Sequence, residues 1–238
     1  MPAERYYHKQ NLQLEGIVHL EGQEHHHLSH VMRTRLGDEI EIVNGLGQLA
    51  TAQVNRLEKN NTSLVITHLF NAPPTKKLIL AQAIPRFARL EFIMEKCTEL
   101  GMTDLWLFRG DRSEKKELSD NQQERLQTLS ISAMKQCGRL FLPKVEIKKP
   151  LKKWESLNEA LLFFGDLNKE VLPFNIAFPQ KKDSLLFFIG PESGFSNEEI
   201  KLFETLNAKG VNFNNNILRT DTAAISAMTL LALLQSTS

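Results

Sequence analysis

The sequence has few cysteines and no histidine in its last 170 residues, and each absence argues against a class of function. It contains only two cysteines, Cys97 and Cys137, and they lie far apart in the chain. Both lie on segments with helical periodicity, which fits reduced core thiols better than a disulfide or a metal site. No histidine follows His68. A nucleophile in the rest of the chain would therefore lack a histidine base, which disfavours a hydrolase of the nucleophile–base type.

No apolar run has the length of a membrane span. The longest, residues 223–234, is interrupted by Ser226 and Thr229 and falls short of the roughly 20 residues that a span requires. We expect a buried helix there. The first ten residues carry charge but no apolar core of a secretory signal, so we expect no membrane association and a cytoplasmic location.

The net charge of +1 conceals an uneven distribution. Residues 1–70 hold 6 basic and 8 acidic side chains, residues 71–182 hold 20 and 14, and residues 183–238 hold 3 and 6. A concentrated positive patch attracts a polyanion because neutralised phosphates release counterions. A solvated lysine face is the alternative. The expected nucleic-acid contacts of the basic middle are Lys148, Lys149, Lys152 and Lys153, with a minor surface formed by Arg5, Arg33 and Arg35.

The first part of the chain has the pattern of a small antiparallel β unit. Residues 38–43 alternate polar and apolar side chains before the tight-turn pair Asn44-Gly45, residues 48–54 form the returning strand, and residues 64–69 alternate again. The rigid segment 71–74, Asn-Ala-Pro-Pro, suits a linker. We therefore expect two domains, residues 1–72 and 73–238.

After the prolines, strand patterns alternate with helical ones. Short, continuous apolar runs between helices are typical of strands that are covered on both faces, which predicts an α/β fold with a mostly parallel sheet. Gly101 and Gly138 are expected to end the first two helices. The expected strands are residues 78–84, 104–108, 145–147, 160–164 and 185–189.

Residues 187–200 are the most informative segment for function. An apolar strand enters Gly190, a tight turn follows through Pro191 and Gly194, and Ser196 with Glu199 has the spacing of a capping box that starts a helix. Ligands of open α/β sheets bind beyond the carboxyl ends of the strands. A binding loop and a plain strand-to-helix turn are both consistent with this pattern.

A second junction, residues 216–224, leads into the last apolar helix. Thr220, Asp221 and Thr222 can each cap that helix. Arg219 does not complement the positive end of the helix dipole, which indicates another partner such as a phosphate or a carboxylate.

The histidine-rich segment 24–30 invites a metal interpretation, because His26 and His30 share one helical face. No cysteine or third ligand lies nearby in the sequence, so we expect no metal site and a polar helix instead.

Taken together, six segments resemble the SPOUT superfamily of knotted S-adenosylmethionine-dependent RNA methyltransferases, and within it the RsmE family. The resemblance covers nearly the whole chain, and six motifs in order are specific where one alone is weak. The segments are His26-His-Leu…Val31-Met-Arg33 with Gly37-Asp38, Glu95-Lys-Cys-Thr-Glu-Leu-Gly101, Arg112-Ser113, Gln136-Cys-Gly-Arg139 with Pro143, Ile189-Gly-Pro-Glu-Ser-Gly194, and Ile217-Leu-Arg-Thr-Asp-Thr-Ala223.

The resemblance implies a PUA-like RNA-binding β-barrel followed by an α/β trefoil-knot domain. It also implies a homodimer that uses S-adenosylmethionine to methylate N3 of a uridine in 16S ribosomal RNA, which we expect to be presented in an assembled 30S particle. For this reaction the candidate catalytic residues are Arg139 and Arg219, to stabilise negative charge on the uracil or hold a phosphate, and Glu192, in an acid/base or cofactor-orienting role. Arg112 joins the expected RNA contacts. The implied cofactor loops contain Phe164 and Gly165, then Ile189, Gly190, Pro191, Glu192 and Gly194, then Leu218, Arg219, Thr220, Thr222 and Ala223.

The chain departs from the family pattern at three places. Ser193 stands where the family usually has glycine, Asp221 stands where it usually has glutamate, and residues 213–216 replace a Leu-Gly-x-Arg run. Two other functions stay open at this point. One is a SPOUT ribose 2′-O-methyltransferase, and the other is a non-enzymatic, RNA-binding ribosome assembly factor.

Overall fold

A computed structural model describes residues 4–114, 117–154, 157, 160–166, 184–212 and 214–236. The chain divides into two compact units. The first contains residues 1–74 and 131–142, and the second contains residues 75–130 and 143–238. The N-terminal unit is therefore discontinuous in sequence.

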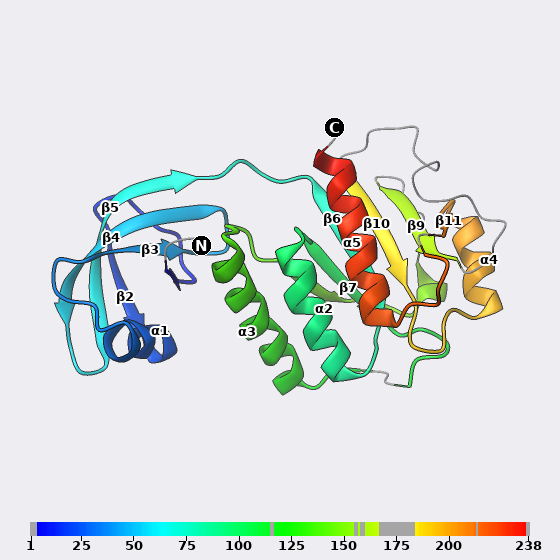
Figure 1. Cartoon of the computed structure of the whole chain (residues 1–238), viewed down its shortest axis with the longest axis horizontal. Helices are drawn as coiled ribbons and strands as arrows, with labels where there is room; N and C mark the ends of the chain where they lie inside the picture. The colour runs from blue at the N-terminus through cyan, green and yellow to red at the C-terminus, as the bar shows by residue number, and fades with distance from the viewer. Residues whose placement is uncertain are drawn as a thin grey trace. The chain divides into compact units, whose positions relative to one another are not determined.

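The N-terminal unit is built on a five-stranded sheet with the strand order β1-β3-β4-β5-β2 (Figure 1). The patterns at residues 38–43, 48–54 and 64–69 correctly predict β3, β4 and β5. Strand β1 pairs parallel with β3, so the sheet is not wholly antiparallel as expected. The strands are β1 (Arg5–Tyr7), β2 (Ile17–Glu21), β3 (Glu39–Val43), β4 (Gln48–Leu57) and β5 (Asn61–Asn71).

A short helical segment lies between β2 and β3. It consists of α1 (Gly22–His26) and a π-helical turn, η1 (His27–Val31). Leu28 is fully buried and belongs to the same apolar core as Tyr6, Ile42 and Leu64. The core of this unit is thus formed by one face of the sheet and the buried side of the helical segment.

The turn between β3 and β4 packs on residues 140–142, which come from much later in the chain. Gly47 N donates to Leu140 O at 2.8 Å, and Leu142 N donates to Gly45 O at 2.9 Å. Gly45 and Gly47 have positive φ angles of 72° and 96°. A Cβ at Gly45 would lie 2.6 Å from the Leu142 side chain. This turn therefore requires glycine both for its conformation and for its close approach.

The second unit contains a six-stranded sheet in which every pair of neighbours is parallel. The strand order is β11-β9-β10-β6-β7-β8. This confirms the predicted α/β fold, and each predicted apolar run corresponds to a strand. The strands are β6 (Lys77–Ala83), β7 (Asp104–Phe108), β8 (Lys144–Ile147), β9 (Leu161–Gly165), β10 (Ser184–Ile189) and β11 (Lys209–Val211).

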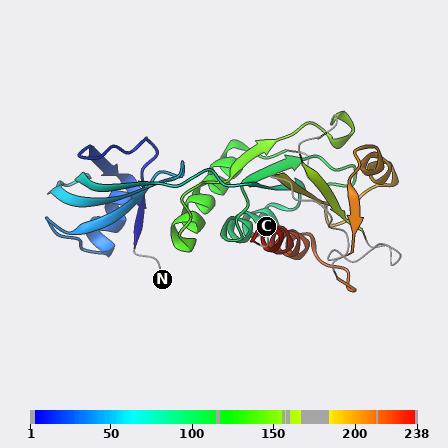
Figure 2. The ribbon, with the colours of Figure 1, turned by 90° about the horizontal axis from the view of Figure 1, so that it is seen from above.

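Helices cover both faces of this sheet, as continuous apolar strands require. On one face, α2 (Phe87–Glu99) packs against α5 (Thr220–Ser236), and on the other face lies α4 (Asn197–Thr205) with the 3-10 turn η2 (Leu151–Lys153) (Figure 2). Adjacent residues of β10 point to opposite cores. Phe187 packs with the α2 and α5 side chains, and Phe188 packs with Phe203 of α4.

Helix α3 (Asp120–Cys137) begins in the second unit and ends in the first. Gly138, with φ of 83°, follows its last turn, and Gly101, with φ of 96°, follows α2, as the sequence predicts. Cys97 is buried and Cys137 is half-buried, and both are free thiols. Burial raises the pKa of the Cys97 thiol. None of the helices in the described ranges combines the length and apolarity of a membrane span.

Candidate active site

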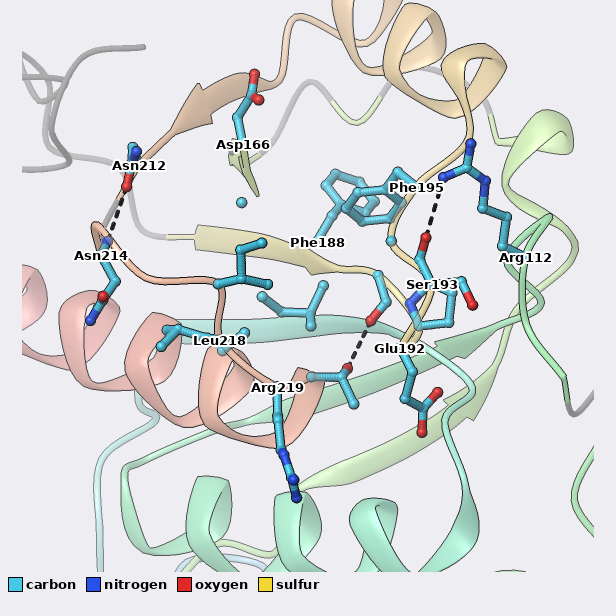
Figure 3. Close-up of a pocket in the computed structure, with 18 of the residues that line it drawn as sticks. Arg112, Asp166, Phe188, Glu192, Ser193, Phe195, Asn212, Asn214, Leu218 and Arg219 are labelled. Atoms are coloured by element: carbon cyan, nitrogen blue, oxygen red, sulfur yellow. Dashed lines mark hydrogen bonds between the residues drawn. The ribbon is translucent and has the colours of Figure 1, made fainter. Parts of the chain in front are cut away.

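A cavity of about 610 Å³ opens at the carboxyl edge of the parallel sheet (Figure 3). Three loops form most of its lining. The first follows β9, the second follows β10, and the third leads from β11 into α5. These are the three segments that the resemblance implies as cofactor loops. Among the predicted cofactor residues, those that line the cavity are Gly165, Ile189, Gly190, Pro191, Glu192, Gly194, Leu218, Arg219, Thr220 and Ala223.

Phe164 and Thr222 are implied cofactor residues that do not line this cavity in the described structure. Phe164 is buried, and its ring stacks on Phe203 with 4.6 Å between the centroids. Thr222 is exposed on α5. The sequence motif thus extends further than the cavity wall.

The second loop is a tight turn that depends on glycine. Gly194 has a φ of 71°, and its N–H donates to Pro191 O at 2.9 Å. A Cβ at Gly190 would come within 3.3 Å of the Gly194 carbonyl carbon. The predicted capping box follows at once, because Ser196 Oγ accepts from Glu199 N and Glu199 Oε2 accepts from Ser196 N. The turn and the start of α4 are therefore fixed locally.

A loop after β7 holds the second loop from the side. Arg112 Nη1 donates to Ser193 O at 3.2 Å, which is one of the dashed contacts in Figure 3. Asp111 N donates to Glu199 Oε1 at 3.0 Å, and Ser196 Oγ donates to Asp111 Oδ2 at 2.7 Å. The Ser196 hydrogen bond, followed by the Lys152 ammonium 3.2 Å away, lowers the pKa of the Asp111 carboxyl. Sequence patterns gave no indication of Asp111.

Thr220 and Asp221 were expected to cap α5, but in the structure their side chains bond to distant elements. Thr220 Oγ1 donates to Gly190 O at 2.7 Å, which ties the start of α5 to the second loop. The Asp221 carboxylate accepts from Arg89 Nη1 at 3.0 and 3.1 Å. Both residues therefore connect the third loop to other elements.

Glu192 of the second loop is held by α2. Its Oε1 lies 3.4 Å from Arg89 Nε and accepts from the backbone N–H of Arg86 at 3.2 Å. Arg89 thus lies between two carboxylates, Glu192 and Asp221, and it also lines the cavity. Sequence reasoning missed Arg89. The signal that could have identified it is a cation in the first turn of a helix, where the dipole does not favour one.

The two predicted catalytic arginines lie in different surroundings. Arg219 is exposed, lines the cavity, and forms no ion pair with the described part of the chain. Figure 3 shows its side chain and that of Glu192 extending to the same side of the loops, away from Asp166 and Asn212. Arg139 belongs to the N-terminal unit and is absent from the described cavity lining. Burial lowers the pKa of its guanidinium.

The predicted RNA-binding cations divide into paired and free side chains. Arg5 is 11% exposed and its Nε lies 2.7 Å from Glu41 Oε2, so this ion pair links β1 to β3. Lys148 contacts Glu146 at 2.6 Å and lies 4.1 Å above the Trp106 ring, while Lys152 pairs with Asp111. The predicted cations that are exposed and for which the structure describes no ion pair are Arg33, Arg35, Arg112, Lys149 and Lys153, of which Arg112 donates to Ser193 O.

The histidine-rich segment forms a helix, as expected, with His26 and His30 stacked at 4.7 Å between ring centroids. No group of three potential metal ligands occurs within the described ranges.

A parallel sheet with a cavity formed by three loops at its carboxyl edge is the arrangement of an α/β ligand-binding domain. A family model described as the RNA methyltransferase domain matches residues 72–232, and one described as the RNA methyltransferase PUA domain matches residues 20–67. The N-terminal sheet accordingly has the PUA-like fold, as an open sheet whose edge strands are β1 and β2.

Similar proteins narrow this class. Ribosomal RNA small subunit methyltransferase E of Rickettsia conorii is 28% identical over 99% of this chain and 98% of its own. The protein of the same name from Mesomycoplasma hyopneumoniae is 30% identical over 67% of this chain and 70% of its own. The crystal structure of the Neisseria gonorrhoeae methyltransferase E bound to S-adenosyl methionine superposes with a TM-score of 0.85, at 26% identity and 98% coverage of both chains. The chain therefore belongs to the ribosomal RNA small subunit methyltransferase E family.

Proposed function

We propose that this enzyme transfers the methyl group of S-adenosylmethionine to N3 of a uridine in small-subunit ribosomal RNA. The observation that carries the proposal is the convergence of three loops on one cavity at the carboxyl edge of the sheet, in a chain of this family. A family member with the same fold is bound to S-adenosyl methionine. The N3 position follows from the family resemblance.

The residues of the cavity fit such a cofactor. Its wall is mainly apolar, with Ile189, Val211 and Leu218 available to a flat adenine ring. Gly190 and Gly194 leave backbone free of side chains where a ligand can approach closely. A volume of about 610 Å³ lies in the range typical of small-molecule and cofactor sites.

When bound, S-adenosylmethionine supplies an activated methyl group on a sulfonium. The task of the protein is then to hold the uracil nitrogen in line with that methyl group and to exclude water. We assign Arg219, which lines the cavity, to stabilising negative charge on the uracil as the N3 proton leaves. Glu192, whose carboxylate is already held by Arg89 and by the Arg86 N–H, suits an orienting role better than that of a base.

The substrate must present an exposed base. N3 lies on the Watson–Crick edge, so the uridine has to be unpaired or flipped before it can react. We propose that an assembled 30S particle presents it, that the enzyme works in the cytoplasm, and that it acts as a homodimer. The free cations Arg33, Arg35, Lys149 and Lys153 are our candidates for phosphate contacts, with Arg112 near the second loop.

Nucleoside mass spectrometry of methylated 30S particles tests the reaction. An N3 methyl group stays with the base after glycosidic cleavage, whereas a 2′-O-methyl group stays with the ribose and blocks alkaline cleavage. A methylated ribose would contradict the N3 assignment and identify the enzyme as a ribose 2′-O-methyltransferase. Absence of methyl transfer to any ribosomal particle would favour a non-enzymatic assembly factor. Light scattering tests the dimer, which a mass near 27.2 kDa at micromolar concentration would reject.

A further inference from the structure

Gln82 is an anomaly in the centre of the parallel sheet. Strand β6 reads Lys-Leu-Ile-Leu-Ala-Gln-Ala, and every residue after Lys77 is buried. Gln82 has 0% of its surface exposed and is flanked by β10 on one side and β7 on the other. A primary amide is costly to bury unless it is hydrogen-bonded. The buried Oε1 has no hydrogen-bond partner among the described residues, so the partners of the amide nitrogen indicate what this residue is for.

The amide nitrogen of Gln82 faces four oxygens at the ends of β6 and β10 and at the start of α5. Nε2 lies 2.8 Å from Ala83 O, 3.0 Å from Thr220 Oγ1, 3.3 Å from Gly190 O and 3.5 Å from Ile189 O. Thr220 Oγ1 in turn donates to Gly190 O at 2.7 Å. The Gly190 carbonyl therefore accepts a hydrogen bond from the Thr220 hydroxyl, and the oxygen of that hydroxyl accepts one from the Gln82 amide.

We infer that the Gln82 amide and the Thr220 hydroxyl form a clasp, by which we mean two buried, hydrogen-bonded side chains that hold the Gly190 carbonyl against the start of α5. The clasp thereby fixes the distance between the second and third loops of the cofactor cavity. Gly190 begins the second loop and Thr220 ends the third, and both line the cavity. Gln82 does not belong to the described lining, so it acts through these two residues as a positioning residue. This inference deepens the proposed function and rests on it.

The clasp has a directional requirement that simple packing lacks. The donors of Gln82 and Thr220 point at the carbonyl oxygens of Ala83 and Gly190, where β6 and β10 end. Loss of the Thr220 hydroxyl would leave Gln82 with one acceptor fewer, and the Gly190 carbonyl would keep only its 3.3 Å contact with Gln82. The distance between the second and third loops would then vary, and a ligand that contacts both would have to fix it on binding.

The test compares Thr220→Val, which is isosteric and lacks the hydroxyl, with Thr220→Ser, which keeps it. Calorimetry with S-adenosylmethionine as the probe should show the dissociation constant of Thr220→Val rising about tenfold or more, because a buried donor–acceptor pair is lost. Thr220→Ser should stay within about threefold of wild type. In turnover assays, KM for S-adenosylmethionine should rise in Thr220→Val while kcat at saturating cofactor changes less.

Thr98→Val is the matched control. Thr98 is a buried threonine in α2 whose hydroxyl donates to Met94 O at 2.6 Å, and it is not among the residues that line the cavity. It should lower the melting temperature without raising the dissociation constant. Gln82→Leu, melted and titrated in the same way, should raise the dissociation constant as Thr220→Val does.

The outcomes separate the inference from the function beneath it. If wild type does not bind S-adenosylmethionine, the proposed function fails. If wild type binds and Thr220→Val binds as tightly, the clasp fails while the function stands. The clasp also fails if Thr220→Ser is as weak as Thr220→Val, or if Thr98→Val loses as much affinity as Thr220→Val.

Discussion

The Nη1 atom of Arg89 lies 3.0 Å from a carboxylate oxygen of Asp221, and this pair fastens the first turn of α5 to the first turn of α2. The same guanidinium lies 3.4 Å from Glu192 in the second loop. One cation thus serves two loops of the cavity. Because one positive charge faces two carboxylates, its removal would break two ion pairs at once.

Arg89→Met is accordingly expected to weaken both folding and cofactor binding. The three side chains are 19–29% exposed, so we expect a loss in the free energy of unfolding of about 1–2 kcal/mol, at the low end for a charged hydrogen-bonded group. Denaturant unfolding and calorimetry with S-adenosylmethionine measure the two effects. Arg125→Met is the control, because Arg125 pairs with Glu91 on a surface where it is 56% exposed. A pair so exposed contributes about 0–1 kcal/mol, and equal losses in both variants would contradict the prediction.

Gly194→Val should reduce cofactor affinity through backbone strain. A Cβ at Gly194 meets nothing within 4 Å, so the reason is the φ of 71° and not a clash. A left-handed conformation costs a residue with a side chain about 1–2 kcal/mol, which corresponds to roughly a tenfold loss if the turn relaxes. Gly194→Asn should lose less, because asparagine tolerates this conformation. Calorimetry with S-adenosylmethionine on both variants measures the two dissociation constants. An unchanged dissociation constant in Gly194→Val would show that the turn can shift without affecting the cavity.

Replacement of Lys149 and Lys153 by serine should weaken RNA binding and flatten its salt dependence. Both are exposed and have no described ion pair, so each is available to a phosphate. Loss of two phosphate contacts should change the slope of log K against log salt by about 1.4–1.8. Replacement of Lys148 and Lys152 by serine is the comparison, because their ammonium groups are already ion-paired with Glu146 and Asp111. Filter binding at several salt concentrations distinguishes the pairs, and a larger effect of the second pair would overturn this division.

Ser196→Ala should lower stability at neutral pH more than in acid. The hydroxyl caps α4 and also donates to Asp111, and loss of such a cap costs about 1 kcal/mol. A carboxyl whose pKa is lowered by folding contributes stability above its unfolded pKa of about 3.9, and this stability is lost as pH falls through the lower folded value. As the pH falls below about 4, the free energy of unfolding should therefore decrease less in the variant than in wild type. Urea unfolding at a series of pH values gives the two slopes, and parallel curves would be evidence against the Asp111 contribution.

The sequence predicted the local features of the molecule and missed those that depend on distant partners. Period-two alternation located β3 to β5, continuous apolar runs located the parallel strands, and the Ser196–Glu199 spacing identified the capping box, because each is a property of a few neighbouring residues. Gln82 and Arg89 bond to residues 138 and 132 positions away. No periodicity encodes such pairs.

The proposed cofactor loops were located by family resemblance, since glycine-rich turns occur at many strand ends. The knot that the resemblance implies has no local signature either, because knots are almost absent from proteins. The parallel pairing of β1 with β3 was missed because three residues, Arg5–Tyr7, are too few for a pattern.

The discontinuity of the N-terminal unit has a consequence for the order of synthesis. This unit includes residues 131–142, and the turn at Gly45 and Gly47 packs on Phe141 and Leu142. A nascent chain that has emerged from the ribosome only as far as residue 74 therefore lacks part of the packing of its own first unit. That packing closes only after residue 142 has followed, by which time β6, α2 and β7 have also left the exit tunnel. The first unit is thus completed only after part of the second has been translated, and a gene fragment ending at the proline linker would encode an unfinished fold.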